Sequence, residues 1–277
     1  MPASNNTTRF SSRTPYYHAS RPRYPQAVIG LLAQHLGLTP QSVVADIGAG
    51  TGISSQLFLD FGCTVYAVEP NAGMRAVAAA EYGDRPNLKL VDGTAEATGL
   101  PDASADFVTA GQAFHWFDPA PSRAEFTRIL KPNGWIVLFW NTRDEEDSVF
   151  MQEYSAFLRV FDKDEGKTRW QAARESVMAR DAFFGEDQLT RHAIPNRQIF
   201  DFDGLLARAL SSSYMPLPGT PEYPQMEAAL RELFDRCQQN GVVSMNYITE
   251  IFGGRLKDYC ESSVSIMDCA QRKMRVW

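Results

Sequence analysis

Apolar and amphipathic stretches alternate regularly through the first half of the chain. Apolar runs of strand length, rich in β-branched and aromatic residues, are separated by stretches whose apolar residues recur with helical spacing. The predicted strands cover residues 43–47, 64–69, 87–93, 106–114 and 135–141. Because strands and helices alternate over residues 28–141, we predict a doubly wound α/β sheet.

The alternation stops at Thr142, and the second half of the chain is mainly helical in pattern. Two amphipathic stretches, residues 143–161 and 168–185, predict a helical cap inserted before the sheet is complete. Residues 197–202 and 242–252 predict a sixth and a seventh strand, with helices between them. We therefore divide the chain into an N-terminal arm or lid (1–25), a core (26–141), a helical cap insertion (142–195), a segment that completes sheet and cap (196–256) and an unassigned tail (257–277).

A glycine-rich turn after the first strand is the clearest functional pattern. Gly48, Gly50 and Gly52 stand at alternate positions, which differs from the G-x-G-x-x-G spacing that places a pyrophosphate on a helix N-terminus. Asp46 precedes them, and an acid there suits a positively charged ligand such as an ammonium or a sulfonium. Glu69 ends the second strand, about twenty residues further on, where an acid accepts both hydroxyls of a ribose.

This pattern, D-x-G-x-G-x-G followed by an acid at the end of the next strand, resembles the S-adenosylmethionine site of class I methyltransferases. The resemblance extends over residues 16–256 through YHASRPRYP, GTAEATGLPDASADFVTAGQAFHWFDP, WNTRD, SSSY and YITEIFGG. These blocks are similar to a small-molecule subgroup of the type 11 kind, of which trans-aconitate methyltransferase is a member of similar outline. The resemblance implies a Rossmann-like seven-stranded sheet with an antiparallel last strand, S-adenosylmethionine as cofactor and residues 26–141 as its binding core.

Cofactor-binding roles follow from the resemblance. It implies that the loop lies under the methionine part, that Glu69 binds the ribose and that residues 93–96 recognise adenine. Thr94 stands where many relatives carry Asp, so that Asp92 and Glu96 are alternatives for the adenine amino group. The cofactor-binding residues that we expect are Arg21, Asp46, Gly48, Ala49, Gly50, Gly52, Glu69, Pro70, Met74, Thr94, Ala95, Glu96 and Gln112.

Candidate residues for the acceptor follow the fourth and fifth strands and lie in the arm. His115 is a catalytic candidate because a neutral imidazole can take the proton of a hydroxyl acceptor; the alternative is a histidine that shapes the pocket wall. A carboxylate acceptor needs no base, and both kinds of O-methylation are favoured. The substrate-binding residues that we expect are Tyr16, Tyr17, Trp116, Asn141, Arg143 and Tyr214.

Composition and charge narrow the function further. Lys and Arg number 27 against 33 Asp and Glu, a net charge of −6 that argues against a nucleic-acid partner. The four cysteines form no C-x-x-C pair and histidines do not cluster, so we expect no metal site. No apolar run is long enough to span a membrane, and the first thirty residues lack the apolar segment of a signal peptide, so we expect a cytoplasmic protein. The resemblance implies a small-molecule acceptor. The oligomeric state of the protein is not predicted.

Three other functions remain open at this point. A non-catalytic, regulatory S-adenosylmethionine-binding protein would share the cofactor residues. A nicotinamide-dependent oxidoreductase would share the fold and the ribose-binding acid, although the loop spacing and Asp46 count against it. A protein methyltransferase would need a docking groove, for which the sequence shows no charged pattern.

Overall fold

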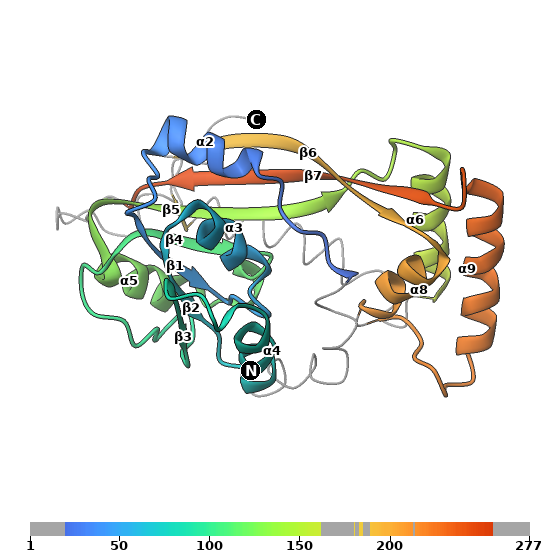
Figure 1. The fold of residues 1–277 in the computed structure, drawn as a ribbon, viewed down its shortest axis with the longest axis horizontal. Coiled ribbons are helices and arrows are strands. Elements are labelled where there is room, and N and C mark those ends of the chain that lie inside the picture. The colour runs from blue at the N-terminus through green and yellow to red at the C-terminus, as the bar shows by residue number, and fades with distance from the viewer. Residues whose placement is uncertain (1–19, 162–179, 181–182, 185–188, 213, 257–277) are drawn as a thin grey trace, which may run out of the picture.

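A computed structural model describes residues 20–161, 180, 183–184, 189–212 and 214–256. In these residues seven strands form one sheet with the order β3-β2-β1-β4-β5-β7-β6 (Figure 1). Strands β1 to β5 are parallel, and β7 runs antiparallel to both of its neighbours, as the sequence predicts. The strands are β1 Val43–Ile47, β2 Thr64–Val68, β3 Leu88–Val91, β4 Ala105–Gly111, β5 Leu130–Arg143, β6 Thr190–Phe200 and β7 Val243–Gly254.

Helices cover both faces of the parallel half of the sheet. One core cluster packs α2 and α3 against alternate strand residues such as Val44 and Phe107, and the other packs α5 against Ala45 and Val108. Strands buried on both faces explain why their sequences are continuously apolar. The helices are α2 Ala27–Leu36, α3 Ile53–Phe61, α4 Ala72–Tyr82, α5 Pro119–Ile129, α6 Val149–Phe161, α8 Phe202–Leu210 and α9 Tyr223–Cys237, with a 3₁₀ turn η2 at Phe114–Trp116.

Two strand boundaries near the sheet centre differ from the sequence prediction. The fourth strand, expected to reach Phe114, ends at Gly111, because Gln112 takes a positive φ of 57° that strand geometry does not allow. Helix α5 begins at Pro119, after the N-cap Asp118. The fifth strand begins at Leu130 instead of residue 135 and passes through Asn133, whose φ is 65°.

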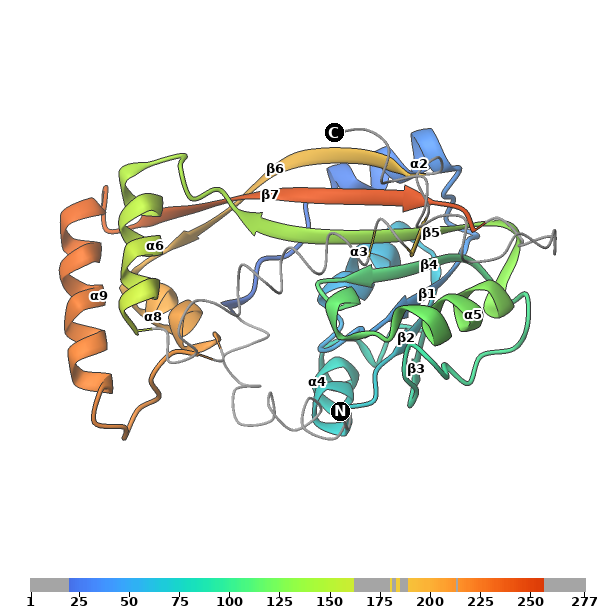
Figure 2. The ribbon, with the colours of Figure 1, turned by 180° about the vertical axis from the view of Figure 1, so that it is seen from behind.

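Strands β5, β7 and β6 continue past the end of β4 and carry a second group of helices (Figures 1 and 2). Helices α6, α8 and α9 pack together there around Tyr154, Leu205 and Leu230, in a cluster that we call the cap. The first predicted cap helix is confirmed as α6, whereas most of the predicted helix at 168–185 lies outside the described residues. Strand β6, expected from residue 197, begins at Thr190.

Candidate active site

The glycine loop lies at the carboxyl ends of β1 and β2. The backbone N–H groups of Gly48 and Ala49 both donate to the Val68 carbonyl, at 2.9 and 3.1 Å, which ties the loop to the end of β2. Gly48 has a φ of 67°, and a Cβ there would stand 2.6 Å from that of Ala113. Both observations require glycine at this position. The sequence therefore produces a tight turn whose backbone can closely approach a ligand.

Asp46 lies behind this loop and not on its surface. Its side chain is fully buried, and its carboxylate accepts hydrogen bonds from the hydroxyls of Ser54 and Ser55, both at 2.6 Å, and of Thr109 at 3.0 Å. Burial raises the pKa of Asp46, against the opposing effect of these hydroxyl donors. The contact with a positive ligand group that we expected from Asp46 is not what the structure supports. Asp46 therefore anchors the start of α3 to the sheet.

Glu69 connects the glycine loop with the start of α4. One carboxylate oxygen accepts from the Gly50 N–H at 3.0 Å and the other from the Asn71 N–H at 2.8 Å. The residue is only 8% exposed, and this burial raises the pKa of its carboxyl group. A carboxylate oxygen accepts more than one hydrogen bond, so both oxygens keep capacity for ribose hydroxyls. The two main-chain donors fix the direction of the carboxylate before a ligand arrives.

Residues next to Glu69 complete this part of the site. Pro70 precedes Asn71, whose side chain caps α4 by accepting from the Met74 N–H at 3.0 Å. Met74 is buried, and its sulfur lies 3.7 Å from where a Gly50 Cβ would stand. The thioether therefore faces the glycine loop. Gly52 ends that loop in the left-handed conformation, directly before α3.

The two acids that the sequence analysis gives as alternatives for binding adenine lie in the segment after β3. Asp92 pairs with Arg75 at 2.8 Å, and Glu96 accepts from the Asp118 N–H at 2.9 Å. A carboxylate oxygen accepts more than one hydrogen bond, so both acids keep acceptor capacity. Asp92 and Thr94 are exposed, and Ala95 is buried. Thr94, Asp92 and Glu96 therefore all remain candidates for the adenine amino group.

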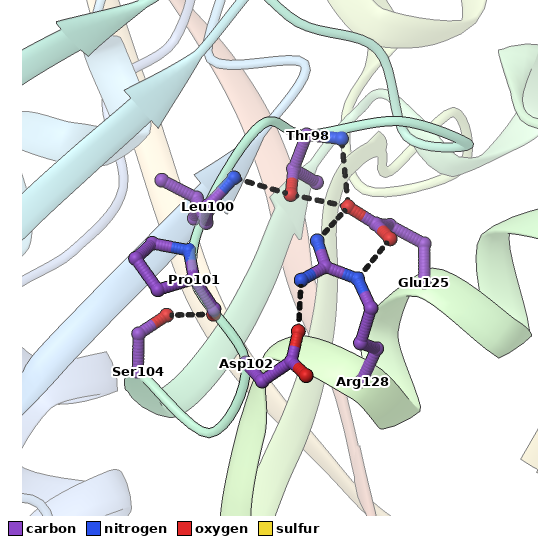
Figure 3. A network of polar contacts seen from close by, with 7 residues as sticks. All are labelled: Thr98, Leu100, Pro101, Asp102, Ser104, Glu125 and Arg128. Carbon is purple, nitrogen blue, oxygen red and sulfur yellow. Dashed lines mark hydrogen bonds and ion pairs between the residues drawn. The ribbon is translucent and has the colours of Figure 1, made fainter.

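A polar network fixes the rest of this segment on α5 (Figure 3). Glu125 accepts from both the backbone N–H and the hydroxyl of Thr98, at 2.8 and 2.5 Å, and Arg128 joins Glu125 to Asp102. The Arg128 and Thr98 hydrogen bonds lower the pKa of Glu125 to about 2. The loop that carries the predicted adenine contacts is thereby anchored at its far end.

The end of β4 brings the predicted reaction centre next to the loop. Gln112 adopts its left-handed backbone there, and its side chain donates to the Asn141 carbonyl at 3.0 Å. Strained backbone of this kind is often found where ligands bind. His115 and Trp116 follow on η2, with ring centroids 4.6 Å apart and both side chains exposed. Partial desolvation of the ring by its neighbours lowers the pKa of His115.

Asn141 has a different role from the substrate contact that we expected. It is 8% exposed, and its Nδ2 donates to the carbonyls of Pro22 and Arg23 at 3.3 and 3.4 Å. Its Oδ1 accepts from the Thr249 hydroxyl at 2.6 Å and from the Asn196 amide at 3.1 Å. Its amide is thus occupied at both ends. Asn141 fastens the segment before α2 to the extended strands.

The remaining predicted residues lie towards the cap. Arg21 donates to the Ser211 carbonyl at 3.0 Å, which places its guanidinium at the end of α8. Tyr214 packs against the cap core. Arg143 ends β5, and its nearest carboxylate oxygen in the described residues belongs to Glu145, at 3.9 Å. Tyr16 and Tyr17 lie outside the described residues. The structure thus places Arg21, Arg143 and Tyr214 with the cap and not at the glycine loop.

Polar cap residues that the sequence analysis missed lie near Arg143. Arg208 is buried on α8, and Tyr154 and Tyr247 are buried beside it. A signal was present, because Arg208 follows Leu205 by three positions and so lies on the apolar face of its helix. Elsewhere, the described residues contain no group of three or more His, Cys, Asp or Glu side chains that could hold a metal ion.

The parallel half of the sheet and its loops are similar to known methyltransferases. Residues 45–138 match a family model described as a methyltransferase domain. An uncharacterised methyltransferase of Mycobacterium tuberculosis (strain H37Rv) is 39% identical over 136 residues, which make up 49% of this chain and 53% of the relative. A methyltransferase-like protein of Schizosaccharomyces pombe is 33% identical over 150 residues, 53% of this chain and 57% of the relative. The chain spans about half the length of the curated relatives that it matches.

Solved structures share the same fold. A protein of Anaeromyxobacter dehalogenans, assigned as a type II methyltransferase, superimposes with a TM-score of 0.62 at 24% identity, covering 85% of this chain and 97% of its own. The YcgJ protein of Bacillus subtilis gives a TM-score of 0.50 at 22% identity, covering 84% and 100%. At these identities the likeness establishes a common fold. In the part of the chain that the structure describes, no helix is long and apolar enough to cross a membrane.

Proposed function

Because the chain carries a class I S-adenosylmethionine-dependent methyltransferase domain, we propose that it transfers the methyl group of this cofactor to a small-molecule acceptor. The observation that carries the proposal is the position of Glu69. Its buried carboxylate is held by the N–H groups of Gly50 and Asn71 and keeps acceptor capacity on both oxygens. That arrangement suits the two hydroxyls of a ribose above a close-approach glycine turn.

The residues present fit the cofactor in a definite order. Gly48 and Ala49 would lie under its methionine part, Glu69 would bind its ribose, and Met74 would contact it from α4. Bound there, the cofactor would supply an activated methyl group to an acceptor oxygen, and the electron pair of the broken C–S bond would stay on sulfur. A hydroxyl acceptor would also lose its proton to water, whereas a carboxylate acceptor has no proton to lose. The chain's own contribution is then to orient the acceptor and exclude water.

His115 serves this reaction as a wall of the acceptor site rather than as a strong base. Partial desolvation lowers the pKa of its imidazole, which is therefore neutral at pH 7 and a weaker base than a free histidine. Its ring lies beside that of Trp116 at a tilt of 46°, and the two rings together present a partly apolar surface to an acceptor at the end of β4. A carboxylate acceptor, which needs no deprotonation, fits this environment, and O-methylation of a carboxylate or a hydroxyl is the reaction that we propose.

The test is transfer of isotopically labelled methyl from S-adenosylmethionine into a metabolite extract. We expect label in small molecules with the wild-type chain and none with Glu69→Ala. The matched control is Glu232→Ala, which removes an exposed acid from α9 and should leave transfer unchanged. Binding of the demethylated product S-adenosylhomocysteine without any transfer would favour a regulatory binding protein, and transfer into protein would favour a protein methyltransferase.

A further inference from the structure

A buried polar cluster lies where the extended strands meet the cap. On β5 and β7, Arg143 stands directly opposite Tyr247, so both side chains lie on the same face of the sheet. Arg208 approaches from α8, and its Nε donates to the Tyr247 hydroxyl at 3.3 Å. Tyr154 of α6 completes the set. We call Arg143, Tyr154, Arg208 and Tyr247 the arginine cluster.

Arg208 carries a buried charge that no carboxylate of the described residues neutralises. The residue is 4% exposed, and the acceptors of its guanidinium are the hydroxyls of Tyr247, Ser211 and Ser212, at 3.2 to 3.4 Å. The half-buried Arg75 and the exposed Arg236, by contrast, each pair with an acid, at 2.8 and 2.6 Å. Burying an unpaired charge is strongly unfavourable, so an anion bound beside Arg208 would stabilise this site.

Other members of the cluster are also left incomplete. The Tyr154 side chain is fully buried, and its hydroxyl has no hydrogen-bond partner among the described residues. The positive charges of both Arg208 and Arg143 act on that hydroxyl, so it lies within their combined field. The Nε of Arg143 is also buried, and no residue that the structure describes accepts from it. Two cations and a hydroxyl donor thus share one small region.

The cluster is connected to the predicted cofactor edge. Gln112, at the end of β4, donates to the Asn141 carbonyl, and Asn141 holds the backbone of Pro22 and Arg23. The neighbouring Arg21 donates to the Ser211 carbonyl, next to the hydroxyl that receives Arg208. Arg143 lies at the carboxyl end of β5 and the glycine loop at the carboxyl end of β1, so an acceptor bound at the cluster would lie at the same edge of the sheet as the loop.

We propose that the arginine cluster binds a carboxylate of the methyl acceptor, so that the acceptor is a small organic acid anchored by Arg208 with Arg143 and Tyr154. The proposal rests on the proposed function and names its substrate class. Nη2 of Arg208 donates to no described residue and carries two N–H donors; with the Tyr154 hydroxyl they match the two oxygens of a carboxylate better than the larger oxygen set of a phosphate. Arg208 orients the acceptor and takes no part in the transfer.

The test separates the metabolite extract on an anion exchanger before the labelled-methyl assay. We expect label only in fractions that the exchanger retains. For such a fraction, Arg208→Met should lower kcat/KM about 100-fold and Arg143→Met about tenfold, with unchanged affinity for S-adenosylhomocysteine. Arg197→Met is the matched control, because Arg197 is an exposed arginine that alternates to the other face of β6. It should stay within about twofold of wild type.

A melting curve of the free protein separates anchoring from a structural role. If Arg208 only supported the cap, Arg208→Met would lower the melting temperature; an anchor for an absent anion predicts an equal or higher one. Label in unretained fractions, or full kcat/KM in Arg208→Met, would overturn the inference and leave the proposed function standing. Absence of label in every fraction would contradict the proposed function instead. The inference then depends on binding: a retained fraction must raise the melting temperature of wild type and not of Arg208→Met, and an equal response would refute it.

Discussion

Alanine substitutions at three glycines with left-handed backbone test the geometry of the glycine loop. Gly48, Gly50 and Gly241 have φ values of 67°, 59° and 79°. An alanine there costs about 1–2 kcal/mol in backbone strain and recovers about 0.4–1 kcal/mol through the unfolded state. A Cβ at Gly241 meets nothing within 4 Å, and one at Gly50 meets only the Met74 sulfur at 3.7 Å. We therefore expect a loss of about 1 kcal/mol for each of these two.

Gly48→Ala should cost much more. Its Cβ would stand 2.6 Å from Ala113 and 3.4 Å from the Phe117 ring, so η2 must move away from the loop. Overpacking of this kind adds about 1–3 kcal/mol, for a total loss of about 2–4 kcal/mol. Urea unfolding of the three variants measures these differences. If Gly48→Ala were no less stable than Gly241→Ala, the loop would not pack against η2 as described.

Cofactor affinity separates the two variants that have equal stability. The methyl group of Gly50→Ala would occupy the space between the loop and Met74, where the cofactor is proposed to lie. Calorimetry should therefore show at least about tenfold weaker binding of S-adenosylhomocysteine for Gly50→Ala and wild-type binding for Gly241→Ala. Equal affinity of the two variants would place the cofactor elsewhere.

Three other predictions concern the elements around the loop. Asn141→Ala should lower the free energy of unfolding by about 2–4 kcal/mol in urea titrations, because it removes four hydrogen bonds, one of them to the buried Thr249 hydroxyl. An unchanged free energy of unfolding would show that Asn141 does not hold the segment before α2 to the strands. Glu125, whose pKa is lowered to about 2, stabilises the fold at pH 6 and loses that effect as the pH falls from about 4.5 towards 2. The difference in free energy of unfolding between wild type and Glu125→Gln should therefore narrow from pH 6 to pH 3, and it would stay constant if the network were absent. His115→Ala should reduce kcat less than about tenfold at pH 7 and should leave cofactor affinity unchanged; a loss of 100-fold or more would restore His115 as a general base.

The sequence predicts the parallel half of the fold because each of its elements has a strong local signal. Strands buried on both faces are continuously apolar, and the glycine turn and Glu69 mark the carboxyl ends of two of them. The edge strand β6 gives no such signal. It alternates between exposed and half-buried residues and contains Pro195, which only an edge strand tolerates well. The sequence pattern therefore places its first six residues, 190–195, in the helical cap insertion.

Roles that depend on distant partners were not predictable from local pattern. Asp46 looks like a ligand-binding acid in sequence, but hydroxyls from α3 and β4 enclose it. Asn141 similarly receives partners from residues more than a hundred positions away, at Pro22 and Thr249. The sequence shows that Arg208 lies on the apolar face of its helix. That no carboxylate of the described residues pairs with it becomes evident only when the fold brings the cap helices together.

The central claim is that the turn at Gly48 and the carboxylate of Glu69 form an S-adenosylmethionine site. Isothermal calorimetry with S-adenosylhomocysteine tests it directly. Two charge-assisted hydrogen bonds to ribose hydroxyls predict that Glu69→Ala weakens binding by about 100-fold or more, whereas Glu232→Ala binds like wild type and NAD does not bind. Equal affinity of wild type and Glu69→Ala for S-adenosylhomocysteine would contradict the account.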